Sequence, residues 1–99
     1  MARNPNTTST GGSFSDDVKI KVWNKAGTIT NEDPNVFRKD KCGARMKFSE
    51  YGNRSSSTGW EIDHIYPVSR GGSDGLENLQ PLNWNNNLEK GDQLNWQCK

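Results

Sequence analysis

The 99-residue sequence lacks the features that define several large classes of protein. It has two cysteines, Cys42 and Cys98, and no C-x-x-C pair, which excludes a structural zinc site built from cysteine pairs. No apolar run approaches membrane-spanning length, and the N-terminus lacks the apolar stretch of a signal peptide. We therefore expect a soluble, cytoplasmic protein whose two thiols are reduced, although a single disulfide is also compatible with the sequence.

Apolar residues are scarce too, at 29% of the chain, so any hydrophobic core is small. A chain of this length forms one small domain, and such a domain needs a metal, a crosslink or dense polar pairing to be stable. The aromatic side chains supply much of the apolar area, above all the four tryptophans, Trp23, Trp60, Trp84 and Trp96.

Composition changes along the chain predict a tail followed by one domain. Residues 1–15 are polar and non-periodic and predict a disordered tail, so the domain spans 16–99. The alternating segment 18–23 predicts a half-exposed strand. Asp33 and Pro34 are typical of the first turn of a short helix that continues to about Lys39.

The second half predicts a more regular succession of elements. Residues 44–48 and 60–64 have the pattern of short strands, and residues 79–82 predict a third strand, whose Pro81 indicates an edge position. A helix is expected over 84–90, capped by Asn83 and ended at Gly91. The fold class is therefore a small α+β domain with short strands and a short N-terminal helix.

Polar residues stand at particular places on these elements. The only histidine, His64, follows Asp63 at the end of a strand, Asn78 lies in the following loop, and Asn87 lies on the helix. The stretch "EIDHIYPVSRGGSDGLENLQPLNWNNNLEKGD" resembles the HNH nuclease family, whose fold around the site is called ββα-metal. The resemblance covers residues 60–92 and has a D-H-x-x-P start, a Gly-rich loop, an E-N-L strand entry and a helix ending in K-G.

The resemblance implies a role for each matching residue. His64 would be the general base that activates water, and Asp63 a ligand of one divalent metal ion. Asn78 would brace the loop and so orient the base, and Asn87 would bind the metal from the helix. The implied activity is hydrolysis of DNA phosphodiester bonds, in duplex or nicked DNA, that leaves 3′-hydroxyl and 5′-phosphate ends.

The chain departs from the commonest form of this family in two ways. The third motif position is Asn87 rather than histidine, and Asn83 and Asn86 stand where zinc-ribbon members have cysteines. Without that zinc, packing must hold the fold. A carboxylate and an amide carbonyl are hard oxygen ligands, which favours Mg²⁺ or Mn²⁺ over Zn²⁺.

Basic residues are concentrated between residues 36 and 54, although the formal net charge of the chain is only +1. Glu61 shares a strand face with Asp63, where a structural ion pair is expected rather than a catalytic role. Two alternatives stay open, a nucleic-acid-binding module without turnover and a non-enzymatic interaction domain. The candidates for contact with DNA phosphates, which surface ion pairs would explain equally well, are Arg38, Arg45, Arg70 and Lys90.

Overall fold

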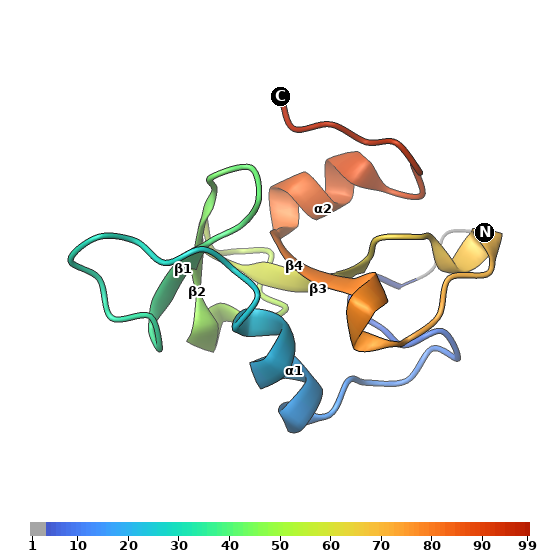
Figure 1. The fold of residues 1–99 in the computed structure, drawn as a ribbon, viewed down its shortest axis with the longest axis horizontal. Helices are drawn as coiled ribbons and strands as arrows, with labels where there is room; N and C mark the ends of the chain where they lie inside the picture. Colours follow the sequence, from blue (N-terminus) through green and yellow to red (C-terminus); the bar gives the residue numbers. More distant parts are fainter. Residues whose placement is uncertain (1–3) are drawn as a thin grey trace.

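The computed structural model describes residues 4–99, which form two helices and two small antiparallel sheets (Figure 1). Strand β1 pairs with β2, and strand β3 pairs with β4. This arrangement confirms the predicted α+β class. The elements in chain order are α1 (Asp16–Trp23), β1 (Phe37–Lys39), β2 (Arg45–Lys47), η1 (Phe48–Glu50), β3 (Trp60–His64), η2 (Val68–Arg70), η3 (Leu76–Asn78), β4 (Leu79–Asn83) and α2 (Trp84–Lys90).

Strands β3 and β4 and helix α2 form a continuous ββα unit. The register of the sheet pairs Trp60 with Asn83 and His64 with Leu79, and every residue of β3 is buried. The side chain of Asn83 accepts a hydrogen bond from the backbone N–H of Asn85 at 3.0 Å and so caps α2, which ends at Gly91. The strands and the helix predicted for this half of the chain are confirmed.

The expected strand over residues 18–23 is wrong, because this segment belongs to helix α1. Ser15 accepts a hydrogen bond from the backbone N–H of Val18, and the two acidic residues of the first turn suit the positive end of the helix dipole. Val22 and Trp23 are buried, whereas Ile20 is 50% exposed. The alternating pattern therefore gave a wrong prediction, because Ile20, its middle apolar residue, lies on the solvent side of the helix.

The helix expected from Asp33 to Lys39 is also wrong. Asp33 begins a single turn, in which its carbonyl accepts from the backbone N–H groups of Val36 and Phe37. The chain then extends into β1, whose pairing with β2 places Phe37 opposite Lys47. The short N-terminal helix of the fold is therefore α1, earlier in the chain than predicted.

The hydrophobic core lies between α1 and the β3–β4 sheet. The indole of Trp23 packs 5.1 Å from that of Trp60 and 5.3 Å from the ring of Phe48, measured between centroids. Val22, Met46 and Leu79 are fully buried in the same cluster. Aromatic rings thus supply much of this small core, as the composition predicts.

Residues 1–15 are expected to form a disordered tail, but residues 4–15 contact the rest of the domain. Residues 1–3 lie outside the described part. Phe14 is 6% exposed and belongs to the core. The side chain of Asn6 accepts a hydrogen bond from the backbone N–H of Ile62 at 2.8 Å, and Ser9 donates to Asp74. The segment therefore lies against the ββα unit, at the side of the loop that follows β3 (Figure 1).

Cys42 and Cys98 form a disulfide, so the expectation of two separate reduced thiols is wrong. The bond joins residues 56 positions apart and ties the C-terminal segment to the β1–β2 turn. Closing a loop of this length contributes on the order of 4 kcal/mol in the chain-entropy account. Such bonds are typical of oxidising compartments, so the cytoplasmic location remains only a prediction.

A buried carboxylate joins this turn to the start of α2. One oxygen of Asp40 accepts from the backbone N–H groups of Cys42 and Ala44 at 3.0 and 2.9 Å. The other oxygen accepts from the backbone N–H of Asn83 and the amide of Asn86, at 3.0 and 2.9 Å. Asn83 and Asn86, which by the resemblance stand at the cysteine positions of zinc-ribbon members, thus both donate to one buried carboxylate.

Candidate active site

A cavity of about 420 Å³ opens where the end of β3, helix α2 and the N-terminal segment meet. Asp63, His64 and Asn87 all line it, together with Arg54 and residues 4–6. Three of the four residues that the sequence singles out for catalysis or metal binding therefore share one cavity. The fourth, Asn78, does not line it and lies in the loop behind His64.

Asp63 and His64 are neighbours in a strand, so regular β structure would point their side chains to opposite faces. Strand β3 ends at His64, and the chain bends through Pro67 into the short helix η2. Both residues line the same cavity. The end of the strand thus resolves the geometric difficulty that the adjacent pair poses.

The loop from Ile65 to Asn78 is compact because two glycines allow it to turn tightly. Gly71 has a φ of 94°, in the left-handed region that favours glycine. A Cβ atom on Gly72 would lie 1.8 Å from the carbonyl oxygen of Tyr66, so no larger residue fits there. The Gly-Gly pair of the motif therefore has a structural cause in this chain.

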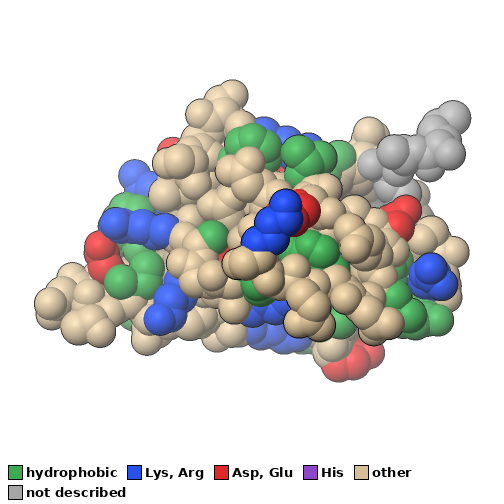
Figure 2. All heavy atoms as spheres, turned by 90° about the horizontal axis from the view of Figure 1, so that it is seen from above, with side chains coloured by type: hydrophobic (Ala, Val, Ile, Leu, Met, Phe, Trp, Pro, Cys, Tyr) green, Lys and Arg blue, Asp and Glu red, His purple; other side chains and the backbone are tan. Residues whose placement is uncertain are grey.

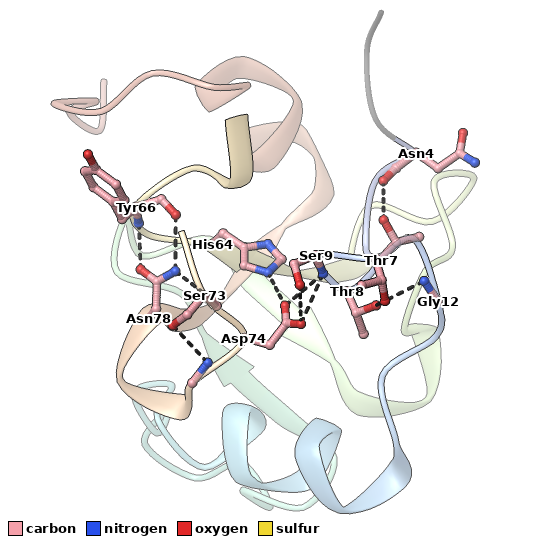
Figure 3. A network of polar contacts seen from close by, with 12 residues as sticks. Asn4, Thr7, Thr8, Ser9, Gly12, His64, Tyr66, Ser73, Asp74 and Asn78 are labelled. Carbon is pink, nitrogen blue, oxygen red and sulfur yellow. Dashed lines mark hydrogen bonds and ion pairs between the residues drawn. The ribbon is translucent and has the colours of Figure 1, made fainter. Parts of the chain in front are cut away.

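Asn78 spans this loop and bonds both of its ends. Its side-chain oxygen accepts from the backbone N–H of Tyr66 at 2.7 Å, and its amide donates to the carbonyls of Tyr66 and Ser73 (Figure 3). Its own carbonyl accepts from the backbone N–H of Ile65, the residue after His64. Asn78 is thus placed to fix the loop without facing the cavity.

The His64 imidazole is 6% exposed and has one ring nitrogen bonded and one free. Its Nε2 atom lies 2.8 Å from a carboxylate oxygen of Asp74, which the sequence does not single out (Figure 3). Within residues 4–99, Nδ1 makes no hydrogen bond, and no buried side-chain nitrogen or oxygen lacks a partner. Nδ1 therefore has no hydrogen-bond partner among the described residues and can accept a proton.

Asn87 projects its side chain from α2, and Glu61 determines which way its amide faces. The amide nitrogen donates to Glu61 Oε1 at 2.8 Å. An ionised carboxylate only accepts, so the nitrogen must face Glu61, and the amide oxygen is left free to serve as a ligand. Arg54 holds Glu61 with two hydrogen bonds of 2.7 and 2.9 Å, which confirms the expected structural ion pair.

Asp63 is buried, and two side chains contact its carboxylate. Lys90 donates to one oxygen at 3.2 Å, and Gln80 donates to the other at 2.9 Å. Burial raises the pKa of Asp63 above its ordinary value, although the hydrogen bond from Gln80 and the charge of Lys90 oppose this shift. Each oxygen accepts one hydrogen bond and so retains a lone pair.

The donor atoms of Asp63 and Asn87 are of the kind that a hard divalent cation prefers. Asp63 and Asn87 offer a carboxylate oxygen and an amide oxygen beside one cavity, and Mg²⁺ sites commonly use few protein ligands and several waters. Within the described chain, no three acidic, histidine or cysteine side chains converge on one point. A metal here would therefore depend on Asp63 and the amide of Asn87.

The four basic residues predicted to contact DNA are placed differently from one another. Arg70 is exposed on η2, and Arg45 is exposed but pairs with Glu32 at 2.6 Å. Arg38 donates to backbone carbonyls, among them that of Ala26 at 3.0 Å. Lys90 is not placed to contact DNA as predicted, because it is 2% exposed and its ammonium donates to Asp63 and to the carbonyl of His64.

Arg54 is a basic residue that lines the candidate cavity, although the sequence gives no reason to prefer it within the basic segment. Its side chain is 36% exposed, and it lines the cavity that contains His64 and Asn87. Figure 2, viewed from the α2 side, shows other Lys and Arg side chains spread over the surface with Asp and Glu between them. No single basic surface dominates this face.

The strand–loop–strand–helix arrangement around Asp63 and His64 defines the class of a ββα nuclease domain. The sequence model of the HNH endonuclease family matches residues 40–93, more than half of the chain. The chain therefore belongs to the HNH endonuclease family. No curated protein and no solved structure matches it. Within residues 4–99, no helix has the length and apolar character needed to cross a membrane.

Proposed function

We propose that this protein is a metal-dependent endonuclease that hydrolyses DNA phosphodiester bonds with His64 as the general base. The observation that carries the proposal is the shared cavity of Asp63, His64 and Asn87, with Nδ1 of His64 making no hydrogen bond to the described residues. Nδ1 would accept the proton of the attacking water. Phosphate and water would meet between the His64 side and the Asp63 side of the cavity.

Asp63 and Asn87 would hold one divalent cation, Mg²⁺ or Mn²⁺ by the chemistry of their oxygens. When bound, such an ion neutralises charge on the phosphate and stabilises the leaving oxygen. The guanidinium of Arg54, at the edge of the same cavity, would contact a neighbouring phosphate of the DNA backbone. By resemblance to the family, the products would carry 3′-hydroxyl and 5′-phosphate ends.

A plasmid-nicking assay with Mg²⁺, Mn²⁺, Zn²⁺ or EDTA tests this function. We expect cleavage with Mg²⁺ or Mn²⁺ and none with EDTA. His64→Ala should lower the rate by about 10²–10⁴-fold, the range for loss of a general base, without weakening metal binding. A matched control is Ile20→Ala, which shortens an exposed side chain on α1. Full cleavage by His64→Ala would refute the mechanism.

One observation favours the second candidate, a DNA-binding module without turnover. Lys90 already supplies a positive charge to Asp63, at 3.2 Å, so the ligand is partly neutralised without a metal. In that case the protein would bind DNA in a gel-shift assay, with no cleavage under any of the metals. Calorimetric titration with Mn²⁺ would then show no binding that depends on Asp63.

A further inference from the structure

The N-terminal segment and the loop after β3 meet at Asp74, beside the only histidine. His64 Nε2 lies 2.8 Å from Asp74 Oδ1. The same carboxylate accepts the backbone N–H of Ser9 at 2.9 Å and the Ser9 hydroxyl at 2.7 Å. Figure 3 shows Asp74 between the imidazole and the N-terminal segment. Residues far apart in the sequence are thus joined through one carboxylate.

We infer that Asp74, held in place by Ser9, is a positioning residue that fixes the orientation and tautomer of His64. An ionised carboxylate has no proton to donate, so the hydrogen between the two groups belongs to Nε2. The other nitrogen, Nδ1, is then the acceptor, which is the form a general base requires. The inference rests on the proposed endonuclease function, since it assigns a role to a neighbour of the proposed base.

The charge state of Asp74 agrees with this geometry. Partial burial alone would raise the pKa of Asp74, but hydrogen bonds from His64 and Ser9 outweigh it and lower the pKa below the ordinary value. The carboxylate is therefore ionised at neutral pH. The arrangement is similar to the Asp-His pair of a catalytic triad, in which the carboxylate holds the imidazole in one tautomer without taking the proton itself.

The N-terminal segment restrains the imidazole at a second point. The ring of Phe14 lies 6.0 Å from that of His64, between centroids, at an angle of 41°. Phe14 is buried, so its own position is fixed by the core. The N-terminal segment therefore reaches the imidazole in two ways, through Ser9, which bonds Asp74, and through Phe14, which lies beside the ring. By this account the catalytic unit includes a segment outside the region that matches the family.

Two measurements test the inference, and the first needs no activity. Because the chain has one histidine, its ring nitrogens give a single pair of ¹⁵N resonances in NMR. At a pH where the ring is neutral, we expect a protonated Nε2 and an unprotonated Nδ1. Asp74→Ala should expose the Nε2 proton to rapid exchange with water. A parent protein with its proton on Nδ1 would overturn the inference.

The second measurement compares cleavage kinetics. Asp74→Ala should lower kcat by about 10–100-fold, as for residues that orient a functional side chain, with KM unchanged. Ser9→Ala should lower kcat less, because the backbone N–H still bonds Asp74, and Asp74→Asn should restore part of the rate. The controls are Asp17→Ala and Ser13→Ala, both on exposed positions.

The outcomes separate the two proposals. If the parent cleaves DNA and Asp74→Ala lowers kcat no more than Asp17→Ala does, the positioning role is refuted while the nuclease function stands. If the parent cleaves nothing, the nuclease function fails, and the NMR measurement still decides whether Asp74 fixes the histidine. An effect on KM rather than on kcat would assign Asp74 to DNA binding and overturn the inference.

Discussion

Replacing Asp40 by alanine tests what holds this fold together without the zinc of ribbon-type members. The Asp40 carboxylate is 4% exposed and accepts four hydrogen bonds, two within its own turn and two from Asn83 and Asn86. Those two asparagines begin α2, the helix that carries Asn87. Asp40→Ala should therefore loosen the helix start as well as the turn.

The magnitude follows from those hydrogen bonds. A hydrogen bond to a charged group contributes about 1.5–3 kcal/mol, and a buried donor left without a partner costs about 1–3 kcal/mol. The full sum overstates the effect, because donors near the surface bind water again, whereas Asn83 is buried. We expect the free energy of unfolding to fall by about 3–6 kcal/mol, equivalent to the complete removal of two such bonds.

Urea denaturation followed by tryptophan fluorescence measures this decrease, with Asp33→Ala as the matched control. Asp33 also accepts a backbone hydrogen bond, from Asn35 at 2.9 Å, but it is exposed, so its replacement should cost no more than about 1 kcal/mol. Asp40→Asn should be intermediate, because an amide cannot accept from all four donors. In buffer without added divalent metal, EDTA should leave the unfolding midpoint of the parent unchanged, because no zinc holds the fold. An Asp40→Ala effect no larger than the control, or unfolding by EDTA, would refute the reasoning.

Two further predictions concern the site, and a third concerns the basic segment between residues 36 and 54. Asn78→Ala should release the Ile65–Asn78 loop and lower the cleavage rate with DNA affinity near normal; an unchanged rate would remove Asn78 from the site. Asn87→His should move the order of metal activity from Mg²⁺ toward softer ions such as Ni²⁺ or Zn²⁺, and Asn87→Ala should weaken activity in limiting Mg²⁺. Reversing the exposed charges of Lys39 and Lys41 should weaken binding to all DNA sequences alike. It should also reduce the slope of log binding constant against log salt concentration by about 0.9 for each phosphate that the protein no longer neutralises. Altered specificity at constant slope would instead indicate base readout.

The parts of the fold that sequence predicts well have strong local signals. The ββα unit has strands bounded by loop residues and a helix with an asparagine cap and a glycine stop, and each signal lies within a few residues of its effect. The first half of the chain has weaker signals. The segment 18–23 fits both a strand alternation and a helix whose buried residues are Val22 and Trp23, and the cap that decides between them, Ser15, falls in what composition predicts as a tail.

The contacts around the motif cannot be predicted from the sequence for a different reason, because the residues that make them are far apart along the chain. Ser9 contacts Asp74 across 65 positions, Glu61 orients Asn87 across 26, and Cys42 bonds Cys98 across 56. No local pattern of polar and apolar residues predicts such pairs, because the residues next to each partner in the sequence carry no information about a partner so far away. Lys90 shows the same limit, since its burial against Asp63 depends on how α2 packs on β3. A motif therefore predicts the groups that would touch metal and water, while the fold decides which neighbours orient them. In this chain the neighbours of the proposed base are Asp74, which Ser9 holds, and Phe14.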